Sequence, residues 1–215
     1  MDLESVFTLV VLPFQIIWEY EVFRKTFFAA LAFLFSLAAY APYAWEVFKN
    51  RAHPTLSSWI SWLAMNVVIL AGMLAQGTIA WQMVAYILGI SLIIVMSLWK
   101  KIPLGWKRLD TFCVVSVGIA IVLWISTENP NTAIVISVAA DCVGTVPMLV
   151  NIWHKPEREP YLPWILTIIG GGFGVLAIQK MSIADALTPI VFFALQALIV
   201  LFLTRKFFRT VSAAH

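Results

Sequence analysis

The sequence predicts an all-α membrane protein with seven transmembrane helices. Hydrophobic residues make up 62% of the chain and charged residues only 12%, and the mean hydropathy is +0.93. A soluble domain carries about twice that share of charge, because its surface must face water. A spanning helix needs about 20 apolar residues, and seven such runs account for most of the 215 residues. The runs are continuous rather than alternating, which favours helices over barrel strands.

The seven predicted spans are the apolar runs between polar breaks. In chain order they cover residues 26–48, 56–77, 79–99, 110–127, 131–153, 161–179 and 182–204. The breaks between them fall at 49–55, 78, 100–109, 128–130, 154–160 and 180–181. Each break is too short to hold a soluble catalytic domain.

Residues 1–25 are predicted to form an N-terminal amphipathic segment. The apolar stretch Val6–Trp18 is too short to cross a bilayer upright, and it contains Pro13. The polar residues of the segment share one side of a helical wheel, which is typical of a helix lying in the interface or packing on the bundle. These residues are Asp2, Ser5, Thr8, Gln15 and Glu19. An eighth, partial span is the alternative.

The positive residues fall mainly on one side of the predicted membrane. Eleven of the 14 Lys and Arg residues lie in the connections after the first, third and fifth spans and in the C-terminal tail. Only Arg24, Lys25 and Lys180 lie on the opposite side. By the positive-inside rule, the side with eleven is cytoplasmic. We therefore expect an integral protein of the inner or plasma membrane with its C-terminus in the cytoplasm.

The chain contains an internal repeat at an offset of 105 residues. Pro42 aligns with Pro147, and in each copy a charged loop follows, then a Trp-Ile pair whose Trp lies 17 residues after the Pro. A single span, 110–127, separates two groups of three, so both groups enter the membrane from the same side. Such an arrangement is a parallel repeat about an axis along the membrane normal. The predicted units are 1–25, a first repeat 26–99, a linker 100–130, a second repeat 131–206 and a tail 207–215.

This arrangement resembles the SWEET and PQ-loop transporter families. The resemblance covers residues 26–206, and its most specific part is the pair Pro42 and Pro147 with cytoplasmic loops behind them. It implies two three-helix bundles joined by a linker helix around a central solute path. The glutamine of the family's Pro-Gln motif is replaced by Tyr43 and Met148. Sugar-transporting members place an Asn on the third helix of each triplet, where this chain offers Ser91 and Gln196.

Four polar residues in the spans are candidate solute-binding residues. Asp141 lies near the middle of its span, where an ionisable group is costly and is a functional candidate by default. The other reading is a protonated Asp that hydrogen-bonds a neighbouring helix. Asn66 and Gln196 are uncharged donors and acceptors that suit hydroxyls or amides, although hydrogen bonding between helices is an equal alternative. Ser91 is the repeat partner of Gln196.

The two matched prolines are candidate hinges. A proline inside a helix removes one backbone hydrogen bond and presses on the carbonyl one turn earlier, which kinks the helix. Proline is also common in membrane helices without any such role. The matched positions of Pro42 and Pro147 favour the hinge interpretation.

The sequence therefore predicts a transporter of a small neutral solute, sugar-like or similar, that works by alternating access between the two bundles. The alternative is a non-transporting membrane receptor or assembly subunit of the same fold, which the two missing glutamines favour. No catalytic, metal-binding or phosphate-binding motif appears in the sequence, so we expect no enzyme activity, no cofactor and no bound metal. Beyond the solute, the expected partners are the lipid bilayer and a second copy of the chain, but no nucleic acid, since the net charge is only +3.

Overall fold

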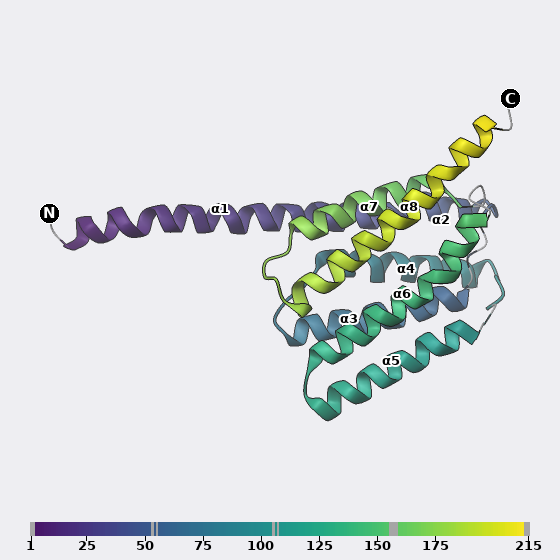
Figure 1. Cartoon of the computed structure of the whole chain (residues 1–215), viewed down its shortest axis with the longest axis horizontal. Helices are drawn as coiled ribbons and strands as arrows, with labels where there is room; N and C mark the ends of the chain where they lie inside the picture. The colour runs from purple at the N-terminus through teal and green to yellow at the C-terminus, as the bar shows by residue number, and fades with distance from the viewer. Residues whose placement is uncertain are drawn as a thin grey trace.

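The computed structural model describes residues 3–52, 54, 56–104, 106, 108–154 and 159–212. Helices connected by short turns and loops make up this part of the chain, and it contains no strand (Figure 1). Six helical stretches are long and apolar enough to cross a membrane, and a seventh helix is apolar but shorter. The prediction of an all-α membrane protein is confirmed at this level.

The first predicted span consists of two helices. The helices α1 (Leu3–Ala38) and α2 (Tyr40–Phe48) are separated by a single residue, Ala39, which forms a turn. Pro42 explains the interruption, because it has no N–H to donate to the carbonyl of Ala38. Within the residues whose side chains are described, the apolar stretch Tyr20–Phe48 is long enough to span a membrane, and it covers the end of α1 and all of α2.

The N-terminal segment is helical but is not a separate helix. The helix α1 is continuous from Leu3, and its first part projects beyond the other helices (Figure 1). The predicted amphipathic stripe falls on residues 1–19, whose side chains lie outside the described part of the structure. That prediction stays open.

The remaining helices follow the predicted runs to within a few residues at most ends. They are α3 (Leu56–Ala75), α4 (Trp81–Trp99), α5 (Arg108–Thr127), α6 (Pro130–His154), α7 (Tyr161–Leu176) and α8 (Thr188–Ser212). The sixth run ends earlier than predicted, at Leu176 rather than residue 179. A five-residue π-helix, η2 (Ile183–Leu187), precedes α8. The last helix continues past residue 204, the predicted end of its span.

The helices pack in two interlocked groups of three. In the first group α4 lies between α1 and α3, and in the second group α8 lies between α6 and α7. The groups meet where α1 packs on α7 and where α3 packs on α6. The helix α5 lies outside both groups, against α3 and α6 (Figure 1).

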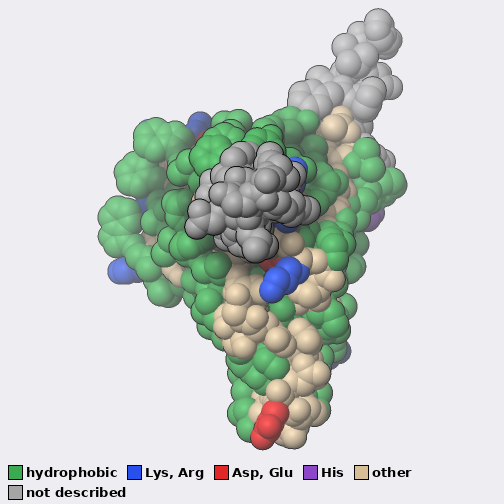
Figure 2. Space-filling model, turned by 90° about the vertical axis from the view of Figure 1, so that its left-hand side faces the viewer, with side chains coloured by type: hydrophobic (Ala, Val, Ile, Leu, Met, Phe, Trp, Pro, Cys, Tyr) green, Lys and Arg blue, Asp and Glu red, His purple; other side chains and the backbone are tan. Residues whose placement is uncertain are grey.

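Two lysines fix which helix ends lie together. At one end Lys100 Nζ donates to the carbonyl of Phe48 at 2.8 Å, which ties α4 to α2. At the other end Lys25 Nζ donates to the carbonyl of Gln179 at 3.2 Å. Figure 2 looks onto this second end, from which α1 projects, and shows mainly hydrophobic side chains with scattered charges.

Glycines allow close contact between the two groups. A side chain at Gly170 of α7 would lie only 2.8 Å from the backbone nitrogen of Ser36 in α1. A side chain at Gly72 of α3 would lie 3.2 Å from the carbonyl oxygen of Pro130 in α6. Both interfaces therefore bring helix backbones together, as small residues do in membrane proteins.

Candidate functional site

A polar cluster lies inside the apolar core, around the hydroxyl of Tyr86. The side-chain amides of Gln82, from the same helix α4, and of Gln196, from α8, both donate hydrogen bonds to this hydroxyl. All three residues are buried. Gln82 and Tyr86 are four residues apart, so they share one face of α4. Ser36 of α1 lies beside the same hydroxyl, so the cluster joins both groups of helices.

Glycines of α7 make room for the amides of this cluster. Any side chain at Gly171 would collide with Oε1 of Gln196, and any side chain at Gly174 would collide with Oε1 of Gln82. The helix α7 therefore presents bare backbone to the cluster. The two amides fill the space that the glycines leave beside α7, so a solute could reach this backbone only if the amides moved.

Two of the candidate residues have a buried amide oxygen with no hydrogen-bond partner among the described residues. These atoms are Oε1 of Gln196 and Oδ1 of Asn66, and Oδ1 of Asn131 is a third amide oxygen of this kind. A buried acceptor without a donor costs about 1–3 kcal/mol, so such atoms are rare in native proteins and call for an explanation. A donor from a bound solute or from water would satisfy both oxygens.

Asp141 faces the interior between the two groups of helices. It is 8% exposed and lies on the face of α6 that carries Ile134 and Val138, both of which belong to the central apolar cluster. Its carboxyl group interacts electrostatically with Tyr40 of α2 and Tyr86 of α4. The predicted inward orientation of Asp141 agrees with this placement, and its role stays a prediction.

Asn66 also faces the central cluster. It lies on the face of α3 that contributes Ile69 and Met73 to the core, and it is 3% exposed. Its Nδ2 atom donates to the carbonyl of Trp62 one turn earlier at 2.8 Å. The amide therefore has one partner in its own helix, and its oxygen points into the core unpaired.

Ser91 does not join the other candidates. It lies nine residues after Gln82, which is two and a half helical turns, so it points to the opposite side of α4 from the cluster. Ser91 is half-buried there, away from Gln196. The repeat offset paired these two residues, but the helical period does not bring them to one site.

The two prolines differ in their local structure. Pro42 follows a break in the helix, whereas α6 is continuous across Pro147. The side chain of Pro147 lies outside the described part of the structure. The kink predicted for both copies is therefore seen as a helix interruption only at the first.

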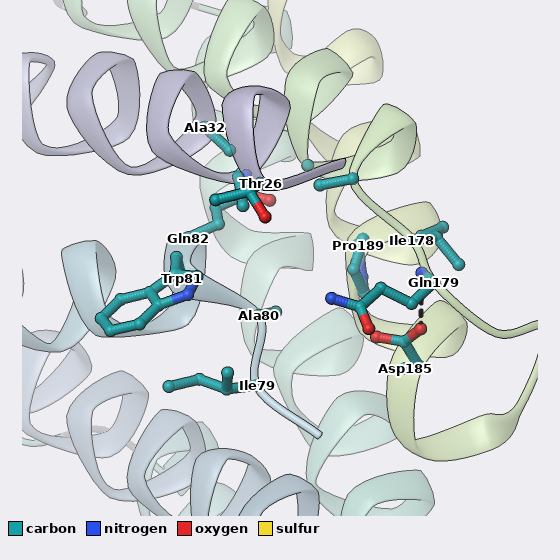
Figure 3. Close-up of a pocket in the computed structure, with 13 residues that line it drawn as sticks. Thr26, Ala32, Ile79, Ala80, Trp81, Gln82, Ile178, Gln179, Asp185 and Pro189 are labelled. Carbon is teal, nitrogen blue, oxygen red and sulfur yellow. Dashed lines mark hydrogen bonds between the residues drawn. The ribbon is translucent and has the colours of Figure 1, made fainter. Parts of the chain in front are cut away.

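A pocket of about 80 Å³ opens toward the end of the bundle from which α1 projects (Figure 3). Its polar side chains come from α1, α4 and the segment between α7 and α8, and they include Thr26, Gln82, Gln179 and Asp185. Gln82 lines the pocket and also donates a hydrogen bond to Tyr86, so this residue belongs to both the pocket wall and the polar cluster. The pocket and the cluster are thus adjacent.

Asp185 organises the irregular backbone beside this pocket. Its Oδ2 atom accepts a hydrogen bond from the backbone N–H of Gln179 at 2.7 Å (Figure 3). The same atom accepts a second one from the backbone N–H of Lys180 at 2.6 Å. Ser182 caps the start of η2 by accepting from the backbone N–H of Asp185 at 3.3 Å. This network holds the chain where α7 has ended and α8 has not begun.

Sequence reasoning missed Gln82, Tyr86 and Asp185. The first two carried a signal, since polar side chains four residues apart in an apolar run indicate a polar stripe on one helix face. The signal for Asp185 was weaker, because acidic residues near loops are common and rarely mark a site. Among the described residues no group of three metal-ligating side chains occurs. No protein-family model, no characterised protein and no solved structure matches this chain.

Proposed function

We propose that this protein transports a small neutral solute by alternating access between two three-helix bundles. The observation that carries the proposal is the buried cluster of Gln82, Tyr86 and Gln196 beneath a pocket at one end of the molecule. Its donors and acceptors are uncharged, which suits hydroxyl and amide groups. The unpaired oxygen of Gln196 supplies an acceptor for such a solute.

The contacts between helices support the repeat on which this mechanism depends. Under the offset of 105 residues, the contacts of α1 with α4 and of α4 with α3 correspond to those of α6 with α8 and of α8 with α7. The packing of α1 on α7 corresponds to that of α6 on α3. Each bundle therefore meets the other through equivalent helices, as rocking about a central axis requires.

The size of the pocket indicates that the bundles must move. Typical ligand pockets have about 300–1,000 Å³, whereas this pocket has about 80 Å³. Below it the space between the bundles is filled by an apolar cluster that includes Ile69, Met83 and Phe192. A solute can reach Gln196 only when the helices around this cluster separate.

The same apolar cluster favours a second candidate function. A bundle whose interior is packed with Ile, Met and Phe side chains suits a membrane receptor or assembly subunit that has no solute path. The two functions differ in one measurable quantity, which is saturable flux across a membrane.

Uptake into proteoliposomes tests the proposal. Labelled polyols, monosaccharides and small amides would be offered to the purified full chain, and at least one is expected to enter with saturable kinetics. Tyr86→Phe removes the hydroxyl that joins both amides, and it is expected to lower the uptake rate at least tenfold. Ser91→Ala is the matched control, since Ser91 lies on the opposite face of α4. Absence of saturable flux for every solute, from protein that is folded and inserted, would favour the second function.

A further inference from the structure

Three exposed aromatic rings form a stacked strip at the end of α2 and α4. The ring centroids of Trp45 and Phe48 are 5.8 Å apart at an interplanar angle of 22°, and those of Phe48 and Trp99 are 6.4 Å apart at 18°. These residues are 54%, 43% and 68% exposed. We call Trp45, Phe48 and Trp99 the aromatic strip. Its rings are not part of the cluster around Tyr86.

Cations lie on and around the aromatic strip. Lys49 Nζ lies 4.6 Å from the ring centroid of Trp45, and Lys100 Nζ lies 5.0 Å from that of Phe48 and 5.6 Å from that of Trp99. Exposed Lys101 follows directly in the chain. Arg51, a fourth cation of this surface, pairs with Glu46 at 2.7 Å, so among the described residues Lys49, Lys100 and Lys101 make no ion pair with an acid.

The cations differ in how free they are to bind an anion. Lys100 is held by the carbonyl of Phe48 at 2.8 Å and by Oδ1 of Asn50 at 3.3 Å, so it mainly fixes the strip. Among the described side-chain interactions, Nζ of Lys49 makes only the contact with the face of Trp45, and Nζ of Lys101 makes none. The ammonium group of Lys49, beside Trp45, and the exposed ammonium group of Lys101, the residue after Lys100, thus remain available.

The position of the aromatic strip corresponds to the level of lipid headgroups. Phe48 and Trp99 are the last residues of their apolar spans, and Lys49 and Lys100 come immediately after them. Aromatic rings of membrane proteins concentrate at this boundary, and basic surfaces between helices bind anionic headgroups there. The depth of the surface, its aromatic rings and its positive charge therefore all favour a lipid headgroup that carries negative charge.

We propose that the aromatic strip with Lys49 and Lys101 binds the headgroup of an anionic phospholipid. The two ammonium groups take the phosphate, and the rings pack against the glycerol and the upper acyl chains. A zwitterionic choline lipid fits less well, because the lysines already cover the ring faces that a quaternary ammonium would use. This inference does not depend on transport, since the surface lies outside the bundle interior.

Lipid binding to the full chain tests this inference. The purified protein would be titrated with phosphatidylglycerol or phosphatidylcholine in detergent, and bound lipid counted by native mass spectrometry. We expect preferential binding of phosphatidylglycerol by the wild type. Lys49→Gln together with Lys101→Gln is expected to weaken that binding about fivefold for each charge removed. Lys49→Arg together with Lys101→Arg keeps both positive charges, so this variant is expected to bind phosphatidylglycerol as the wild type does.

The control is Lys180→Gln, which removes one positive charge at the opposite end of the bundle. It is expected to leave phosphatidylglycerol binding unchanged. Equal binding of the two lipids by the wild type would overturn the inference. A loss in Lys180→Gln as large as that in the double variant would also overturn it, because the effect would then be one of net charge. Both glutamine changes are at exposed side chains, so folding is expected to be intact.

Discussion

At the scale of single residues, removal of the Asp185 side chain should disturb the end of the bundle from which α1 projects. Asp185→Ala leaves the backbone N–H groups of Gln179 and Lys180 without their acceptor, and each such hydrogen bond contributes about 0.5–1.5 kcal/mol. We expect a lower melting temperature in detergent. Asp185→Asn keeps one oxygen acceptor at the same place, so its melting temperature should fall clearly less. Equal losses in both variants would contradict this reading of the network.

At the scale of helices, the break between α1 and α2 predicts that Pro42 matters more than Pro147. Pro42→Ala restores an N–H that can bond to Ala38 and join the two helices into one. We expect slower solute exchange with little change in expression or binding. Pro147→Ala should have a smaller effect, because α6 is already continuous there.

The matched control for this pair is Pro163→Ala. Pro163 is the third residue of α7, as Pro42 is of α2, but no helix directly precedes α7. Its replacement therefore cannot fuse two helices, and exchange should be unchanged. If all three variants exchange solute at the wild-type rate, the prolines contribute to helix packing only and are not hinges.

Helix positions could be predicted from the sequence, but the meeting of side chains could not. Hydropathy located α3, α4, α5 and α6 to within about two residues, because a bilayer demands apolar runs of fixed length. The sequence pattern placed Asp141 and Gln196 inside spans, but it did not show which neighbouring helix each side chain faces. Ser91 was chosen by repeat offset, although the helical period turns it away from Tyr86. The contact of Gln196 with Tyr86 links residues 110 positions apart and depends on helix packing alone.

At the scale of the whole molecule, the arrangement predicts a defined orientation. The end that holds Lys49, Arg51, Lys100 and Lys101 also receives α8, so we expect a reporter fused after His215 to be cytoplasmic. A reporter inserted at Gly77 should be outside. Gly77 is exposed with a positive φ of 69° and open space around it, so an insertion there should not disturb packing. Protease protection of both fusions on one side would contradict seven spans.

The shortness of α7 has a consequence for the bilayer around it. Its 16 residues give a helix of about 24 Å, whereas the hydrocarbon layer is about 30 Å thick. Leu162, Ile169 and Leu176 face outward from this helix, so lipid must adapt to the mismatch. The membrane beside the turn that Asp185 holds would therefore be thinned, and headgroup water would come closer to the pocket there. Lipids with shorter acyl chains would relieve this strain. The acyl-chain length of the host membrane thus becomes a variable that acts on the end of the protein where the pocket opens.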